Sequence, residues 1–228
     1  MGRRGSTQDV GTTGSAPGAA VTVGAGAVVL VSGASLVVYV LTGAPMWLVL
    51  ALLVLMAAVV VGATVWRDEG RRRHWLARVA VGVPVGLVAT VAYDASRWLL
   101  VEVLDFHASP FKAFPLFGQA LLPVAGEGPV QLGVGIAFHL LNGVAFGCAY
   151  AVWFGHRPWW WGIGFALALE AFMLAIYPGW LDIRTLEEFT TMSVLGHVVY
   201  GTVLGLGTRH LLARRSGATT APDGPREP

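Results

Sequence analysis

The sequence predicts an all-α, polytopic membrane helix bundle of about six transmembrane helices. Of its 228 residues only 12% are charged and 55% are hydrophobic, whereas soluble domains carry about 25% charged residues. The chain also contains long uninterrupted apolar runs, with arginines and tryptophans gathered near their ends. These features are typical of a chain that is embedded in a lipid bilayer.

Six segments are apolar enough to cross a bilayer, because a spanning helix needs ~20 predominantly apolar residues. The predicted spans are 21–42, 45–66, 75–100, 130–154, 159–177 and 190–212. We expect the polar ends, 1–20 and 214–228, to be disordered. Residues 21–213 then form a single six-helix transmembrane domain.

Basic residues predict the orientation of the bundle. All Lys and Arg except Arg97, Lys112 and Arg184 fall near the termini or in segments that would share one side with them. Cytoplasmic loops carry such an excess, so we expect both termini in the cytoplasm and 101–129 outside. This is typical of a multi-pass protein of the bacterial inner (cytoplasmic) membrane. The net charge of +2 gives no indication of nucleic acid as a partner, and a homo-oligomer or a membrane partner stays open.

One sequence motif occurs twice within the apolar segments. HLLNGVAFG at 139–147 and HVVYGTVLG at 197–205 share the pattern H-x-x-x-G-x-x-x-G. Glycines at this spacing let helix backbones pack closely. The pattern predicts that two helical hairpins, 75–154 and 159–212, form a parallel repeat about an axis along the membrane normal.

Three ionisable residues lie at membrane depth, where charge is costly and usually faces the bundle interior. His139, Glu170 and His197 each fall roughly 10–14 Å below the outer surface at ~1.5 Å per residue. Asn142 and Tyr200 lie about one turn from the histidines. We predict that these five residues form a buried polar layer.

An outer vestibule is predicted above this layer. Its candidate residues are Asp94, Arg97, Asp182, Glu187 and Glu188. The spacing of Asp94 and Arg97 permits an ion pair within one helix. The loop 101–129 is rich in phenylalanine, which predicts either a lid folded over the bundle or an anchor in the membrane interface.

Several functions fit such a layer. Imidazole and carboxylate groups can exchange protons, which favours the handling of protons or a small solute. His139, Glu170 and His197 are also candidate ligands for a metal, and two histidines can hold a haem. The polar groups could instead only join helices in a structural or partner-binding subunit. The common hydrolase, metalloprotease and nucleotide-binding motifs are missing from the sequence, which leaves open whether the protein is an enzyme.

The sequence also resembles a known group. HLLNGVAFGCAY at 139–150, the E-x-F before the last span and LGHVVYG at 195–201 are similar to the YagU-like small bacterial inner-membrane proteins, over about residues 85–212. Members often carry an acidic residue one turn before the late histidine, where this chain has Ser193. The resemblance implies an inner-membrane location and no particular activity. Supporting the envelope under stress is a further function that the sequence leaves open.

Overall fold

The computed structural model describes residue 24 and the ranges 26–66, 68–123 and 128–218. Within these ranges the chain is entirely helical, which confirms the predicted fold class. The elements are η1 (Val28–Leu30), α2 (Val31–Thr42), α3 (Met46–Thr64), α4 (Glu69–Leu104), α5 (Ala113–Leu121), α6 (Pro129–Phe154), α7 (Trp161–Trp180) and α8 (Leu186–Ala218).

Five of these helices are long and apolar enough to cross a membrane: α3, α4, α6, α7 and α8. A sixth, shorter apolar segment covers Val28–Thr42. It corresponds to the first predicted span, whose residues 21–23 lie outside the described ranges, as does the predicted disordered segment 1–20. The protein is therefore a multi-pass membrane protein by helix length and apolarity.

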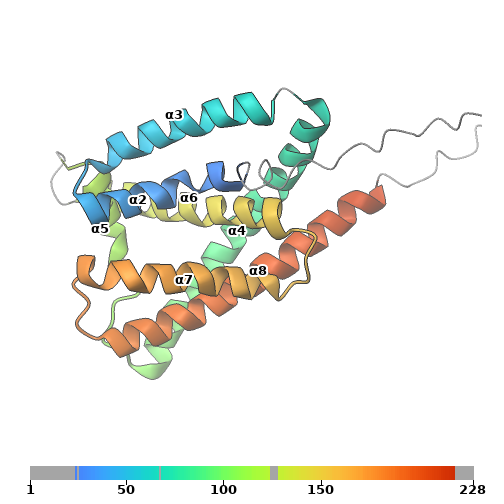
Figure 1. Ribbon diagram of the computed structural model, residues 1–228. Helices are drawn as coiled ribbons and strands as arrows, with labels where there is room; N and C mark the ends of the chain where they lie inside the picture. Colours follow the sequence, from blue (N-terminus) through green and yellow to red (C-terminus); the bar gives the residue numbers. More distant parts are fainter. Residues whose placement is uncertain (1–23, 25, 67, 124–127, 219–228) are drawn as a thin grey trace, which may run out of the picture.

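Helix α4 lies at the centre of the arrangement (Figure 1) and packs against both α6 and α8. Helix α7 packs against α8, and α2 joins α3 to the rest of the bundle. Helix α3 is peripheral: its 18-residue apolar window has a mean hydropathy of 2.8 and only 6% of that window is buried. Such a surface suits contact with lipid.

The last helix extends beyond its predicted end at 212 and reaches Ala218. Arg215 donates a hydrogen bond to the carbonyl oxygen of Ala77 at 2.9 Å and lies 3.5 Å from that of Ala80. Pro84 lies inside α4 and has no N–H to donate to the Ala80 carbonyl four residues earlier. Arg215 thus supplies a partner for a carbonyl that the proline leaves open, and it ties the end of α8 to α4.

Glycines set two close helix contacts. A Cβ atom added at Gly147 of α6 would lie only 2.6 Å from the Cα atom of Gly86 of α4. A Cβ atom added at Gly201 of α8 would lie 2.5 Å from the carbonyl oxygen of Gly162 of α7. In each hairpin, this glycine of the second helix therefore faces the first helix.

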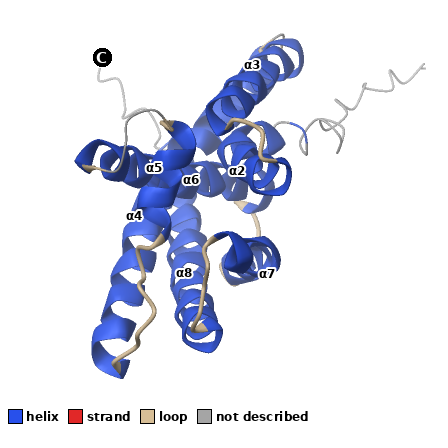
Figure 2. Cartoon of the chain, turned by 90° about the vertical axis from the view of Figure 1, so that its left-hand side faces the viewer, coloured by secondary structure: helices blue, strands red, loops and turns tan. Residues whose placement is uncertain are grey.

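The outer loop contains a helix that folds back on the bundle. Helix α5 packs against α6 and crosses in front of it in Figure 2. Phe117 is buried, and a Cβ atom at Gly118 would collide with the backbone of Gln131. Of the two alternatives for 101–129, this arrangement matches the lid.

Candidate functional site: two acid–histidine pairs beside one cavity

The deeper pair joins the last two helices. The Nδ1 atom of His197 lies 3.0 Å from Oε2 of Glu170, and their side chains are only 8% and 2% exposed. Nδ1 also lies 2.9 Å from the backbone oxygen of Ser193, one turn earlier in α8. The Ser193 contact has the geometry of a hydrogen bond, whereas neither carboxylate oxygen of Glu170 has a hydrogen-bond partner among the described residues. We therefore treat the contact between Glu170 and His197 as mainly electrostatic.

A buried carboxylate of this kind has to be neutralised. In a medium of low dielectric constant it needs either a cationic neighbour or its own proton. His197, the closest basic side chain, can be that neighbour. The pair can therefore hold one proton on either member.

The second pair joins α4 and α6. The Nε2 atom of His139 lies 3.0 Å and 3.1 Å from the two carboxylate oxygens of Asp94, and both side chains are about four-fifths buried. Asp94 thus belongs to the polar layer rather than to the vestibule. It forms no ion pair with Arg97 in the described part of the chain, because its carboxylate faces α6 while the guanidinium lies over the ring of Tyr93.

Tyr93 connects the two pairs. Its ring centroid is 4.9 Å from that of His197 and 6.2 Å from that of His139. The predicted buried layer did not include Tyr93. The available signal was the spacing of Thr90, Tyr93 and Arg97, which places polar groups on one face of an otherwise apolar helix.

The partnership of Asp94 with His139 also had a signal in the sequence. Gly86 and Asp94 in α4 have the same spacing as Gly162 and Glu170 in α7. A Cβ atom on Gly86 would meet the carbonyl of Gly143, and one on Gly162 would meet that of Gly201. Each histidine precedes its contacting glycine by the same interval. The two acid–histidine pairs therefore occupy equivalent places in the two hairpins.

A cavity of about 70 Å³ lies between the hairpins. Its polar lining comprises Thr90, Tyr93, His139, Asn142, Tyr177, His197 and Tyr200. The Tyr200 hydroxyl donates to the carbonyl of Gly143 at 2.8 Å. Asn142 is buried, and its Oδ1 atom has no hydrogen-bond partner among the described residues. The cavity therefore offers an acceptor that a bound donor could satisfy.

A second cavity of about 50 Å³ lies closer to the outer loop and shares Tyr93, Phe117 and His139 with the first. Of the predicted vestibule residues, Arg97 lines this second cavity. Glu188 accepts hydrogen bonds from the backbone N–H groups of His107 and Ala108 at 2.8 Å and 2.9 Å. Asp182 and Glu187 are exposed. The vestibule is thus an acidic surface in which Glu188 fixes the start of the outer loop.

The geometry gives no support to a metal or haem site. No group of three His, Cys, Asp or Glu side chains that could hold a metal ion occurs in the described ranges. The predicted triad is instead divided, since His139 pairs with Asp94 and His197 pairs with Glu170. A haem is as large as ligands that need pockets of roughly 300–1,000 Å³, and the shared cavity holds about 70 Å³.

Comparison with protein-family models, with curated proteins and with solved structures found no match.

Proposed function

We propose that this protein moves protons, alone or together with a small solute, across the bacterial inner membrane. One observation carries the proposal: two acid–histidine pairs, one from each hairpin, lie beside a single cavity between the hairpins. In transporters built from repeats, substrate and coupling-ion sites lie at the repeat interface near the middle of the bilayer.

The proposed route begins at the outer loop. A proton would pass from the vestibule through the smaller cavity to the pair of Asp94 and His139. The ring of Tyr93 separates this pair from Glu170 and His197, and the 70 Å³ cavity provides room for water between the histidines, since one water needs ~10–15 Å³. Each imidazole can pass a proton to or from its own carboxylate.

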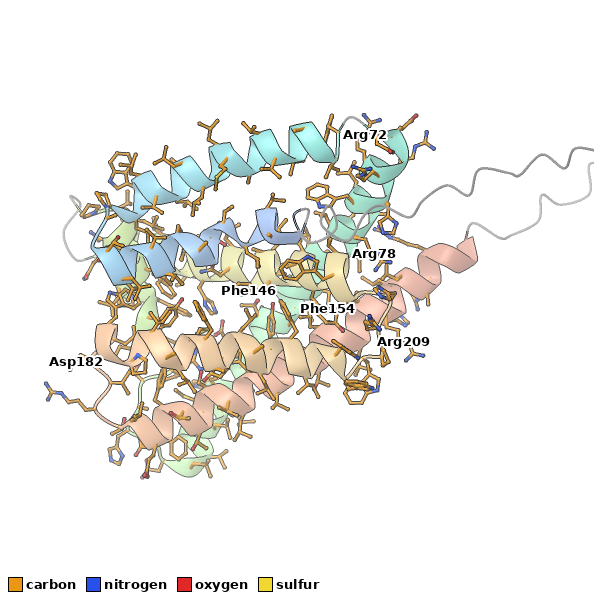
Figure 3. All side chains as sticks on the ribbon, viewed as in Figure 1. Arg72, Arg78, Phe146, Phe154, Asp182 and Arg209 are labelled. Atoms are coloured by element: carbon orange, nitrogen blue, oxygen red, sulfur yellow. The ribbon has the colours of Figure 1, made fainter. Side chains whose placement is uncertain are left out.

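The proposed location has two supports. Figure 3 shows Arg72, Arg78 and Arg209 toward one end of the bundle and Asp182 at the other, which is the asymmetry that the positive-inside rule requires. The resemblance to YagU-like inner-membrane proteins supports the same membrane.

Proteoliposomes that contain a pH-sensitive dye test the proposal. With an imposed pH gradient and a potassium potential clamped by valinomycin, liposomes with the wild-type protein should lose the gradient faster than empty liposomes. Glu170→Gln keeps the shape of the side chain but cannot carry a proton, so the rate should fall to that of empty liposomes. Glu102→Gln, which changes an exposed carboxylate near the end of α4 that lines neither cavity, should keep the wild-type rate.

The melting temperature of each variant verifies that it is folded. If folded Glu170→Gln protein dissipates the gradient as fast as the wild type, the buried pairs are not the route. If wild-type and empty liposomes behave alike, with and without added small solutes, the proton function is wrong.

A further inference from the structure

Arg97 is a buried cation with no carboxylate partner among the described residues. Its side chain is 7% exposed, and its Nε atom has no hydrogen-bond partner among the described residues. The guanidinium carbon lies 4.8 Å from the centroid of the Tyr93 ring. A Cβ atom added at Gly196 would lie 2.9 Å from Cγ of Arg97, so the side chain is packed against α8. Arg97 therefore lines the cavity as a largely buried cation with no carboxylate beside it among the described residues.

The nearest carboxylates are already engaged. Asp94, one turn earlier in α4, directs both oxygens at His139. Glu170 lies against His197. No carboxylate lies within 4.0 Å of Arg97 in the part of the chain that the structure describes. A buried charge without an opposite charge is costly, so an anion bound beside Arg97 would stabilise it.

The cavity next to Arg97 has donor groups among mostly apolar side chains. Besides Arg97, its polar lining comprises Lys112, Ser109, Ser193, Tyr93, His139 and Tyr177, and no Asp or Glu side chain lines it. The Lys112 ammonium donates to the backbone oxygen of Asp182 at 2.7 Å and has further N–H groups available. Two cations and no carboxylate around one small space favour an anionic ligand.

We propose that this cavity binds a small free carboxylate, namely a short-chain monocarboxylate such as acetate or butyrate. A guanidinium group presents parallel N–H donors that match the two oxygens of a carboxylate. The cavity of about 50 Å³ holds roughly three to five water-sized groups. The adjoining cavity, which Phe146 and Leu169 line, takes the alkyl chain.

This identification deepens the proposed function. Movement of the bound carboxylate together with protons rests on the proposed function. Binding at Arg97 does not require proton movement, so it can be measured separately. A neutral acid would form when a proton from His139 meets the bound carboxylate, because His139 lines both cavities.

Binding of radiolabelled butyrate to the full chain in phosphatidylcholine nanodiscs tests the proposal. Arg97→Met keeps the length of the side chain and removes the charge, so affinity should fall about tenfold or more. Arg97→Lys keeps the charge but loses the paired donors and should give an intermediate loss. Arg184→Gln is the matched control, because Arg184 is exposed at the same end of the bundle and does not line this cavity. It should bind butyrate like the wild type.

Three outcomes would overturn the proposal. One is equal butyrate affinity in wild-type protein and in either folded Arg97 variant. Another is Arg97-dependent binding of inorganic phosphate or chloride but not of butyrate, which would identify a different anion. The third is Arg97-dependent stabilisation by phosphatidylglycerol in the nanodisc without butyrate binding, which would identify a lipid headgroup. Glu170→Gln should still bind butyrate, so a failed proton assay does not hide a functional carboxylate site.

Discussion

The two histidines differ in how completely their surroundings exclude water. The side chains of His197 and Glu170 are 8% and 2% exposed, whereas those of His139 and Asp94 are 18% and 20% exposed. A polar group that loses its partner costs more where water cannot replace it. The pair formed by α7 and α8 should therefore contribute more to stability than the pair formed by α4 and α6.

His197→Ala should lower the free energy of unfolding more than His139→Ala. His197→Ala leaves the buried carboxylate of Glu170 without its partner, so we expect the free energy of unfolding to fall by roughly 1–3 kcal/mol. In His139→Ala, water can reach Asp94 through its partly exposed side, so the loss should be smaller. Unfolding of both variants in detergent, followed by tryptophan fluorescence, measures the difference.

The double variant Glu170→Gln/His197→Ala is the control. It removes the stranded charge, so it should recover part of the stability that His197→Ala loses. Equal losses in the two single variants would contradict the difference in burial.

At the level of residues, the sequence predicts the depth of the polar groups but not their pairing. Distances from the span ends predict His139, Glu170 and His197 at one depth, whereas the structure pairs only Glu170 with His197. Asp94 was assigned to Arg97 because a pair within one helix is the simplest local solution. The rotation of α4 about its axis decides between Arg97 and His139, and that rotation depends on the glycine contacts with α6, which are long-range.

The close contacts between helices lie at glycines where a side chain would not fit. In α6, Gly147 faces the backbone of Gly86, whereas Gly133 has no atom within 4 Å of an added Cβ. Both glycines lie inside the same helix, so they share the same helix propensity. They differ only in packing.

Gly147→Ala should destabilise the bundle by roughly 1–3 kcal/mol, which is typical of overpacking. A methyl group would meet backbone atoms of α4, namely the Cα of Gly86 at 2.6 Å and the carbonyl oxygen of Gly82 at 2.7 Å. Backbone atoms cannot relieve the clash by rotating away, as a flexible side chain can. Gly133→Ala should be neutral or slightly stabilising, because alanine favours helix. Melting temperatures in one detergent compare the two, and equal values would mean that α4 and α6 separate easily.

Helix α5 is the element that the sequence left undecided. Phenylalanines indicated an apolar surface in 101–129, but lipid and a protein interior are both apolar, so composition could not distinguish an anchor from a lid. The deciding contacts are Gly118 against Gln131 and Gly135 against Phe114. They join residues from two helices whose pairing no local pattern specifies.

The molecule as a whole has a charge asymmetry that predicts its orientation. The arginines of 71–73 lie at the start of α4, and Ser109 lies in the outer loop before α5. The orientation follows from the positive-inside rule and is directly testable, because both Asp68 and Ser109 are exposed.

Single cysteines at these positions, in a Cys148→Ala background, should differ in their reaction with a membrane-impermeant maleimide on whole cells. Ser109→Cys should be labelled from outside, and Asp68→Cys only after the cells are opened. The Cys148→Ala protein without a new cysteine is the control for background. Labelling of Asp68→Cys on intact cells would reverse the orientation.

The helices also differ in how they can enter the membrane during synthesis. The window of α3 has a mean hydropathy of 2.8 and is 6% buried, whereas that of α8 has a mean hydropathy of 1.4 and is 50% buried. A translocon releases strongly apolar segments into lipid unaided, but weaker ones need partners that are already present. Helix α3 should therefore insert early and alone, and α8 last.

Until α8 arrives, Glu170 of α7 has no histidine beside it. A ribosome that stalls before residue 186 would leave a membrane-embedded carboxylate exposed on an unfinished chain. The cell's membrane proteases could then recognise the incomplete product by the same charge that the finished protein neutralises with His197.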